Sequence, residues 1–514
     1  MTERILHVSI VNDASLQFAL AISEKYGHGR DDHAIALDKF VQKSPFALTL
    51  DFREVYSLQV YRLANELSLS IAPDDTLLIG GLQKYLAQTY NIIHRCKGVD
   101  LAIGEVERYY TTNVGFWASY IQKHQISMII FYAYPHESVD FILYQLAKVL
   151  GLKVVINSYS LDNSRGYYIS SIEDVPARLV NKYAQLQSQY KNSSIDEIPL
   201  TGEYSKRFEQ QLGKESQKIP WYMTRRNINN QRLTAMCGFS YQMAKEYYQV
   251  YKKDWKKLGA SRKFVVRLWL YSLIAPLMAF DSRFFNSRFS MFFACLFRKE
   301  ARGTMKLIKR YNELCTPADF SKKYVYFPLH YQPECTSNPQ GGGMYYNQAI
   351  PIRILSASLP NDVYIFVKEH PTQNYGARRP EFYSELLSIP RVVLVQEDTS
   401  SYDLIKHRLA VSTLVGTAGW EGLFYQKPFI MFGYWVTMCA PGVYHVRTVE
   451  ECKSAVDKIL SGQDHFTLKD LRLFFKAMDE SECYNLLQQD ANSSSFLPRL
   501  DFNLKLFDEF YHTL

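Results

Sequence analysis

The sequence lacks several short motifs that carry well-known chemistry. None of its 514 residues forms a DxD pair, a GxxxxGK[ST] loop, a GxSxG elbow or an HExxH helix. These absences argue against P-loop enzymes, hydrolases with a nucleophile elbow and zinc proteases of the HExxH type. Without DxD, a diphosphate lacks its usual metal-bridging ligand pair. We therefore expect an anionic ligand to be held by positive charge and helix dipoles, with no metal and no other cofactor.

Cysteine pairs and long apolar runs are also missing. The eight cysteines form no CxxC pair and have no regular spacing, which favours neither a zinc site nor a disulfide framework. The longest apolar run, at 268–280, has 13 residues and contains a proline. A membrane-spanning helix needs about 20. The first residues, "MTERILHVSIVND", are too polar for a signal peptide and predict a strand. We expect a cytoplasmic protein.

Aromatic residues and a moderate positive charge are abundant instead. The chain has 38 Tyr, 31 Phe, 47% hydrophobic residues and a net charge of +8. A chain of this length exceeds the usual single core, so two domains with additions are expected. The charge suits acidic small molecules or an anionic membrane surface, and no nucleic-acid partner is expected.

Strand and helix signals divide the chain into three parts. In 1–200, strand-like runs at 5–11, 75–81, 126–134 and 152–158 alternate with helical pieces, and 136–151 predicts a helix that closes on Gly151. In 316–514, the runs "KYVYFPL", "DVYIFV", "RVVLV", "LAVST" and "KPFIMFG" predict strands with helices between the last four. Successive units of this kind predict an α/β fold with parallel, doubly wound sheets.

The middle part, 201–315, predicts a helical insertion that mixes bases with rings. Its densest stretch contains Lys252, Lys253, Lys256, Lys257, Arg262, Lys263 and Arg267 beside Trp255, Phe264 and Trp269. Bases and rings together are typical of binding to an anionic bilayer, which would place the protein peripherally on the inner face of the cytoplasmic membrane. The alternative is that the rings pack between the two domains and the bases form a solvated face.

The stretch "FVKEHPTQ", 366–373, ends a predicted strand with a cation, an acid and an imidazole. Ligands of open parallel sheets bind beyond the carboxyl ends of the strands. Lys368 and His370 are candidate donors to a phosphate, and Pro371 fixes the direction of the turn. The alternative is that Lys368 and Glu369 are solvated and His370 bonds a loop carbonyl.

A second candidate is "VSTLVGTAGWEGLFYQKP", 411–428, where a strand is followed by the start of a helix. Backbone N–H groups and hydroxyls at such a start form an anion cradle. The candidate residues of this cradle are Ser412, Thr413, Gly416, Thr417 and Gly419. Glu421 is a candidate acceptor for a ribose hydroxyl. The alternative is a tight contact between helix and sheet, with Glu421 on the surface.

Two further stretches supply candidate catalytic groups. In "YFPLHYQPECTSNPQGGG", 326–343, His330 and Glu334 follow a strand and precede a glycine-rich loop that could close over a ligand. In "AYPHESVD", 133–140, Glu137 follows a strand of the first part and would face the same cleft from the opposite wall. The alternatives are an ordinary proline-bounded turn and an acidic helix N-terminus stabilised by the dipole.

The combination "HYQPE", "KEHPTQ" and "STLVGTAGWEGLFYQKPFIMFG" resembles the capsule polysaccharide synthesis family that includes β-Kdo transferases. The resemblance covers roughly 320–435 and implies a GT-B-like fold, with two Rossmann-like domains facing a cleft. It implies that His370 and Pro371 contact the phosphate of a CMP-sugar. It also implies that Ser412, Thr413, Gly416 and Thr417 form the phosphate-side loop, with Glu421 at the ribose.

These observations predict a glycosyltransferase that moves a Kdo-type ulosonic acid from a CMP-sugar to a glycan or lipid-linked glycan acceptor. The departing monophosphate needs preorganised donors, which Lys368, His370 and the amides of 416–419 would supply. A carboxylate on the opposite wall would act as base, or as nucleophile if the configuration is retained. The alternatives are a transferase that uses a UDP- or GDP-hexose, and a non-catalytic capsule assembly or export factor.

Overall fold

The computed structural model describes most of the chain outside the middle part. The described residues are 2–36, 40, 43–55, 60–97, 102–161, 164–212, 306–371, 373, 378–463 and 465–514. The basic and aromatic stretch 252–299 lies outside these residues, as does most of the predicted insertion 201–315. Its predicted binding to membranes therefore stays a prediction.

The described residues form two β-sheets, the first mixed and the second parallel, with helices around them. The strands of the first sheet are β1 (Ile5–Ile10), β2 (His33–Ala36), β3 (Leu48–Asp51), β4 (Met128–Phe131), β5 (Lys153–Tyr159), β6 (Arg165–Ile169) and β13 (Cys483–Tyr484). Those of the second are β7 (Lys323–Pro328), β8 (Val363–Lys368), β9 (Val392–Leu394), β10 (Ala410–Thr413), β11 (Phe429–Met431) and β12 (Val443–His445).

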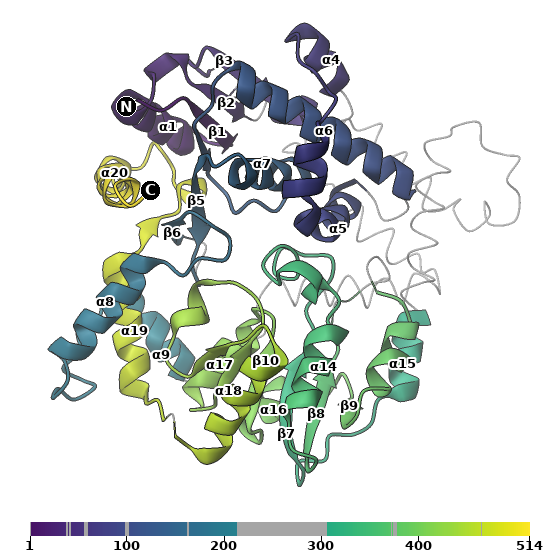
Figure 1. Ribbon diagram of the computed structural model, residues 1–514. Coiled ribbons are helices and arrows are strands. Elements are labelled where there is room, and N and C mark those ends of the chain that lie inside the picture. Colours follow the sequence, from purple (N-terminus) through teal and green to yellow (C-terminus); the bar gives the residue numbers. More distant parts are fainter. Residues whose placement is uncertain are drawn as a thin grey trace, which may run out of the picture.

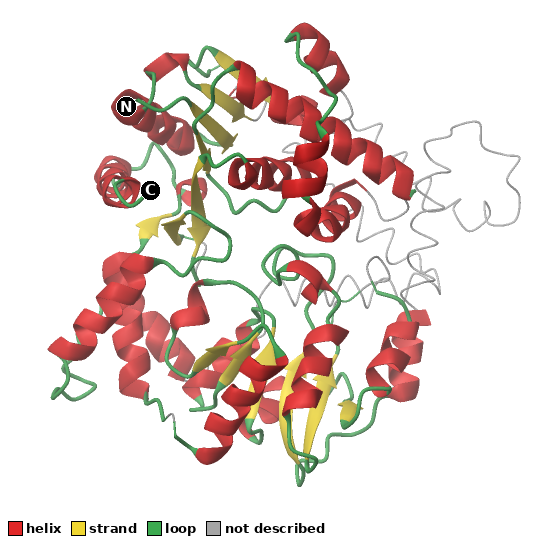
Figure 2. Ribbon diagram, viewed as in Figure 1, coloured by secondary structure: helices red, strands yellow, loops and turns green. Residues whose placement is uncertain are grey.

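The helices follow the strands in the order expected of βα units. The first domain has α1 (Asp13–Tyr26), α3 (Phe52–Val55), α4 (Val60–Glu66), α5 (Leu86–Lys97), α6 (Ile103–Lys123), α7 (Ser138–Val149), α8 (Ala177–Gln189) and α9 (Gly202–Leu212). After the middle part come α14 (Ala349–Ser358), α15 (Glu381–Leu387), α16 (Ser401–Lys406), α17 (Thr417–Phe424), α18 (Val449–Ser461), α19 (Leu468–Ser481) and α20 (Phe496–Tyr511). Figure 2 shows helices on both sides of the strands in the lower domain.

The two sheets share the order of their first six strands, and the first sheet adds β13 at one edge. Within the described residues, the first sheet runs β13-β6-β5-β4-β1-β2-β3 and the second runs β12-β11-β10-β7-β8-β9. All pairs of the second sheet are parallel, while β6 is antiparallel to both of its neighbours. In each sheet the order reverses beside the first strand, at β1/β4 and at β7/β10. This confirms the predicted α/β class with two Rossmann-like domains, and such reversal points are where ligands bind.

The strand signals correspond to strands that are buried on both faces. Tyr324, Val325, Tyr326 and Phe327 of β7 are all at most 2% exposed, as parallel strands covered by helices require. The predicted helix at 136–151 is α7, and Gly151 follows it with a φ of +68°, the conformation in which glycine ends helices.

One predicted strand is wrong and several real strands have weak signals. Residues Thr76–Gly81 form a helical turn in which none of the residues is buried, so their apolar run reflects no sheet. The strands β2 and β3 have four residues each, "HAIA" and "LTLD", and lie on the β1 side of the first sheet. Runs this short carry little periodicity.

The end of the chain returns to the first domain. After α19 the chain enters the first sheet as β13, and α20 lies beside α1, close to the N-terminus (Figure 1). The Asn12 amide donates to the carbonyl of Leu486 at 2.9 Å. The expected C-terminal domain, 316–514, therefore gives its last segment to the N-terminal sheet. The signal is hidden in the sequence because β13 has two residues.

Within the described ranges, no helix combines the length and the apolar character that a bilayer crossing requires.

Candidate functional site

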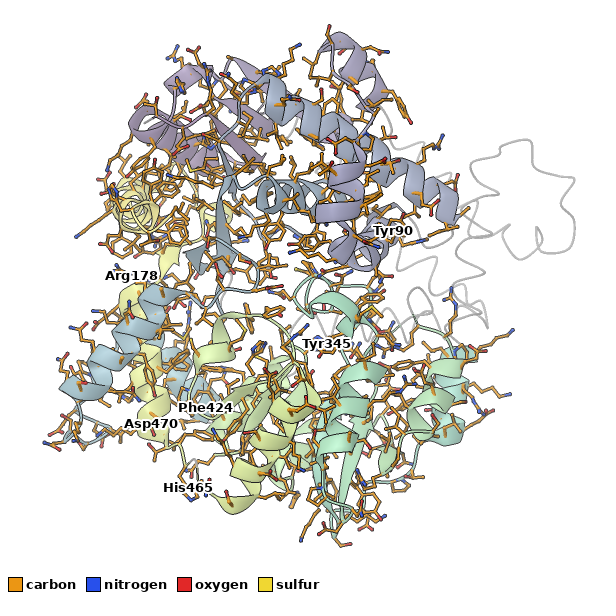
Figure 3. All side chains as sticks on the ribbon, viewed as in Figure 1. Tyr90, Arg178, Tyr345, Phe424, His465 and Asp470 are labelled. Carbon is orange, nitrogen blue, oxygen red and sulfur yellow. The ribbon has the colours of Figure 1, made fainter. Side chains whose placement is uncertain are left out.

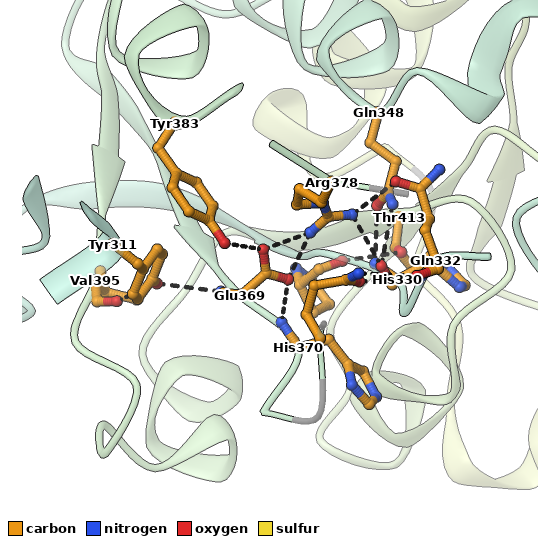
Figure 4. Close-up of polar contacts among 12 residues, drawn as sticks. Tyr311, His330, Gln332, Gln348, Glu369, His370, Arg378, Tyr383, Val395 and Thr413 are labelled. Carbon is orange, nitrogen blue, oxygen red and sulfur yellow. Dashed lines mark hydrogen bonds and ion pairs between the residues drawn. The ribbon is translucent and has the colours of Figure 1, made fainter. Parts of the chain in front are cut away.

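The candidate site lies where the carboxyl ends of β7, β8 and β10 meet. His330 follows β7, His370 follows β8 and Val415 follows β10. The strands β7 and β10 are neighbours across the reversal point of the second sheet. Figure 4 shows the polar contacts that join the loops after β7 and β8.

His330 is buried, and both of its ring nitrogens have partners. Its Nε2 accepts a hydrogen bond from the Val415 N–H at 3.3 Å, and its Nδ1 lies 3.3 Å from the Thr336 hydroxyl. Burial, with the positive charge of Arg378, lowers the pKa of His330 to about 4. The imidazole is therefore neutral near pH 7. Because Nε2 accepts, the proton of the ring belongs on Nδ1.

A buried ion pair lies next to His330. Arg378 Nη1 is 2.5 Å from both carboxylate oxygens of Glu369, and the Tyr383 hydroxyl donates to Glu369 at 2.6 Å. The two charged side chains are 1% and 7% exposed. The Glu369 carboxylate also accepts from the backbone N–H of His370 at 2.6 Å. Glu369 thereby fixes the turn that carries His370.

The same arginine reaches the loop after β7. Arg378 Nη2 donates to the His330 carbonyl at 3.1 Å and to Gln332 Oε1 at 2.8 Å. The Gln348 side chain also pairs with the backbone of His330, at 2.8 and 3.1 Å. The pair of Glu369 and Arg378 therefore ties together the loops after β7 and β8. Sequence reasoning missed both roles, and the available signal was the acid inside "KEHP", directly after a buried strand.

The side chains of Lys368 and His370 point in different directions. The Lys368 ammonium donates to the Thr399 carbonyl at 2.6 Å and to the Ser401 hydroxyl at 3.2 Å, and burial lowers its pKa. Lys368 is thus directed at the loop before α16. The His370 ring is half-buried, lies 5.7 Å from the Tyr331 ring and points away from the pair of Glu369 and Arg378 (Figure 4). Pro371 follows it in the turn.

The residues of the predicted cradle divide into a buried strand and a helix start. Ser412 and Thr413 lie in β10 with no exposed surface, and the Thr413 hydroxyl donates to the Pro328 carbonyl at 3.2 Å. Gly416 precedes the first residue of α17, Thr417. A Cβ at Gly416 would lie 3.3 Å from His330 Nε2. The backbone at 416–417, rather than the two hydroxyls of β10, is thus the part beside His330.

Gly419 and Glu421 lie further along α17. A Cβ at Gly419 would come within 2.4 Å of the Phe429 ring, so this glycine permits close packing of helix on sheet. Burial raises the pKa of the Glu421 carboxyl to about 7, although a hydrogen bond with Thr417 opposes the shift. Burial and the nearby Glu421 carboxylate together raise the pKa of Tyr402 to about 12. Glu421 is therefore half-buried and lies close to Tyr402 of α16.

Glu334 and Glu137 lie on neighbouring loops of the two domains. The Thr336 hydroxyl donates to Glu334 Oε2 at 3.0 Å, and the Cys96 thiol donates to Glu137 Oε2 at 2.9 Å. Burial, and to a smaller extent both carboxylates, raise the pKa of Cys335 to about 11. Both acids thus lie near one thiol, as expected if the loops after β4 and β7 face each other.

Direct hydrogen bonds hold the two domains at this junction. Arg95 of α5 donates to the Asn338 carbonyl at 2.6 Å and also to the carbonyl of His136. The Asn338 amide donates to the Gln88 carbonyl at 3.0 Å, and the Gln88 amide donates to the Pro339 carbonyl at 3.2 Å. Figure 3 shows side chains in the region between the two ribbons, with Tyr345 on the lower side.

The glycine-rich turn at 341–343 is anchored rather than open. Arg447 donates to the Gly341 carbonyl at 3.1 Å and lies 3.9 Å from the centre of the Tyr345 ring. Gly342 has a φ of +73°, and a Cβ there would come within 2.6 Å of Tyr434. The glycines therefore allow a close turn against Arg447 and Tyr434.

No group of three or more His, Cys, Asp or Glu side chains arranged for a metal ion occurs among the described residues. Independence from metals stays a prediction.

Comparison with known proteins gives one family match and several solved structures. Residues 349–452, from α14 into α18, match the model of the family "Capsule polysaccharide biosynthesis protein". No curated protein matches the chain.

The solved structures that match are loosely similar. The β-Kdo 2,7 transferase KpsC of Thermosulfurimonas dismutans is 19% identical over 30% of this chain and 50% of its own, with a TM-score of 0.20. The matched region thus spans half the length of that relative. The UDP-GlcNAc 2-epimerase of Methanocaldococcus jannaschii, solved with UDP-GlcNAc and UDP, is 10% identical over 91% of this chain and 97% of its own, with a TM-score of 0.26. The UDP-GlcNAc 2-epimerase of Neisseria meningitidis is 9% identical over 94% of this chain and 100% of its own, with a TM-score of 0.23.

The family match covers the loop after β8 and the start of α17, which are two of the three segments that build the candidate site. Proteins of that family take part in capsule polysaccharide biosynthesis. Residues 349–452, in the C-terminal domain, are thus similar to the capsule polysaccharide biosynthesis family.

Proposed function

We propose that this protein is a cytoplasmic glycosyltransferase of bacterial surface polysaccharide synthesis. It transfers a Kdo-type ulosonic acid from a CMP-sugar to a glycan or lipid-linked glycan acceptor. The observation that carries the proposal is the convergence of three segments on His330. The turn at His370 and Pro371 is tied to the His330 backbone through Glu369 and Arg378. The start of α17 at Gly416 and the loop with Glu334 approach the His330 ring.

The chemistry requires stabilisation of a departing phosphate. The bond between the anomeric carbon and the phosphate oxygen breaks, and CMP leaves with the bonding electron pair. His370 and the amides at the start of α17 are the donors that would stabilise its charge. Glu421, beside Thr417, is the candidate contact for the ribose hydroxyls.

The acceptor side requires a carboxylate. The acceptor hydroxyl forms the new bond to the anomeric carbon, and its proton passes to a base. Glu334 and Glu137 are the carboxylates on the two loops that Arg95 joins at this junction.

Thermal stabilisation by nucleotides tests the proposal. CMP, UDP and GDP are added to the protein at equal concentrations, and the melting temperature is measured. A larger rise with CMP than with the other two supports a CMP-sugar donor, because ligands that bind the folded state raise its stability. Equal rises would defeat the CMP assignment, a larger rise with UDP or GDP would favour a hexose donor, and no rise would favour a non-catalytic role.

A pair of histidine variants makes the test specific to the site. His370→Ala is expected to fold and to lose most of the stabilisation by CMP. His465→Ala, at the exposed far end of the C-terminal domain (Figure 3), is the matched control and should keep it.

A further inference from the structure

A continuous series of polar contacts connects Val415 to Glu334. Val415 lies in the loop between β10 and α17, residues 414–416, which is called the donor loop below. The Val415 N–H donates to His330 Nε2, His330 Nδ1 contacts the Thr336 hydroxyl, and Thr336 donates to Glu334 Oε2. Each contact fixes the direction of the next. Since Nε2 accepts, Nδ1–H donates to Thr336, whose own proton is then free for the carboxylate.

The imidazole in this series is held rigidly. Gln348 pairs with the backbone of His330, and Arg378 donates to its carbonyl. The ring is buried and uses both nitrogens, so it has no nitrogen left for a substrate. The lowered pKa of His330 agrees with a neutral ring, and a protonated ring would lose its bond with Val415. His330 is therefore suited to positioning rather than to proton transfer.

The two candidate carboxylates differ in their connection to the donor loop. Glu334 reaches Val415 through Thr336 and His330. Glu137 contacts the Cys96 thiol and lies 3.7 Å from His136 Nε2, both in the first domain. His330 contacts the donor loop and, through Thr336, also orients Glu334. Among the contacts of the described residues, it has no such connection to Glu137.

We propose that Glu334 is the carboxylate that receives the acceptor proton, and that His330 and Thr336 are positioning residues that align it with the donor loop. The proposal rests on the glycosyl transfer proposed above. In the step, the acceptor O–H bond breaks as its oxygen bonds to the anomeric carbon. The proton goes to Glu334, and CMP leaves with the electron pair of the broken bond.

Kinetics of CMP release test the proposal, with CMP-Kdo as donor and water as acceptor. Glu334→Gln is expected to lower kcat by about 10²-fold or more. Thr336→Val should lower kcat by about tenfold and leave the KM for CMP-Kdo within about twofold, whereas Thr336→Ser should restore kcat. Thr111→Val removes a threonine hydroxyl on α6, outside the site, and is the matched control that should match the wild type.

The double variant separates positioning from general damage. If Thr336 acts through Glu334, the variant with both Thr336→Val and Glu334→Gln is no slower than Glu334→Gln alone. Multiplied effects, an unchanged kcat in Thr336→Val, or a larger loss of kcat in Glu137→Gln than in Glu334→Gln would overturn the proposal.

A spectroscopic measurement distinguishes failure of this inference from failure of the proposed function. In protein labelled with ¹⁵N-histidine, the signal that disappears in His330→Gln should show a protonated Nδ1 and a bare Nε2. A protonated Nε2 would overturn the relay whether or not the enzyme is active. Absence of CMP release by the wild type, with the expected tautomer present, would defeat the proposed function and with it the role of Glu334 as base.

Discussion

At the scale of single residues, Arg378 is the group on which the geometry of the site depends most. It neutralises Glu369 and also donates to the carbonyl of His330 and to Gln332. A buried charge without a partner is far more costly than an exposed one, because water cannot replace the lost contact. The loops after β7 and β8 are therefore stabilised as one unit.

Replacement of Arg378 should destabilise the protein strongly. Arg378→Met leaves the Glu369 carboxylate buried without its cation, which is expected to cost about 3–5 kcal/mol. Arg353→Met is the matched control, because Arg353 pairs with Glu385 on the surface and exposed pairs contribute about 0–1 kcal/mol. Urea unfolding measures both losses. Equal losses in the two variants would show that the buried pair has no special role.

At the scale of elements, α20 connects the end of the chain to its beginning. Phe507 on α20 has no exposed surface, and its ring lies 5.5–5.8 Å from the rings of Phe18, Tyr26 and Tyr168. The Lys25 ammonium, at the end of α1, pairs with Asp508 at 2.8 Å. The helix thus completes the core of the N-terminal domain.

Truncation of Phe507 should weaken the N-terminal domain, although the residue is near the C-terminus. Phe507→Ala is expected to cost about 3–5 kcal/mol through the cavity it leaves. Hydrogen exchange should become faster in α1 and stay unchanged in α14. Phe502→Ala, at a position of the same helix that is 37% exposed, is the control and should have a much smaller effect. Faster exchange in α14 alone would contradict this placement of α20.

The elements differ in how far the sequence predicts them. Runs such as "KYVYFP" and "VYIFVK" form strands buried on both faces, so nearly every residue is apolar and the signal is strong. The short β2 and β3 have no such run. The strand β13 pairs with β6, which lies more than 300 residues earlier in the chain.

The candidate site shows the same division. Loops that follow the carboxyl ends of neighbouring parallel strands lie at one edge of the sheet, where ligands bind. His330, His370 and Gly416 could therefore be grouped from the sequence. The partners of Glu369 could not, because Arg378 comes from a loop and Tyr383 from the following helix. The directions of Lys368 and Thr413 also depend on tertiary contacts that no local pattern encodes.

At the scale of the whole molecule, two sheets that share the order of their first six strands face each other across a junction of hydrogen bonds. Arg95 of α5 joins the loop after β4 to the loop after β7, and Gln88 of the same helix pairs with the loop after β7. In the proposed function the donor binds at the reversal point of the second sheet, and Arg95 joins the loop that carries Glu137 to the loop after β7.

A crystal structure of the protein with CMP tests where the donor binds. The phosphate is expected between the turn at His370 and Pro371 and the start of α17 at Gly416 and Thr417, with the ribose directed at Glu421. CMP at the β1/β4 reversal point of the first sheet, or no bound CMP at a concentration that saturates thermal stabilisation, would contradict it.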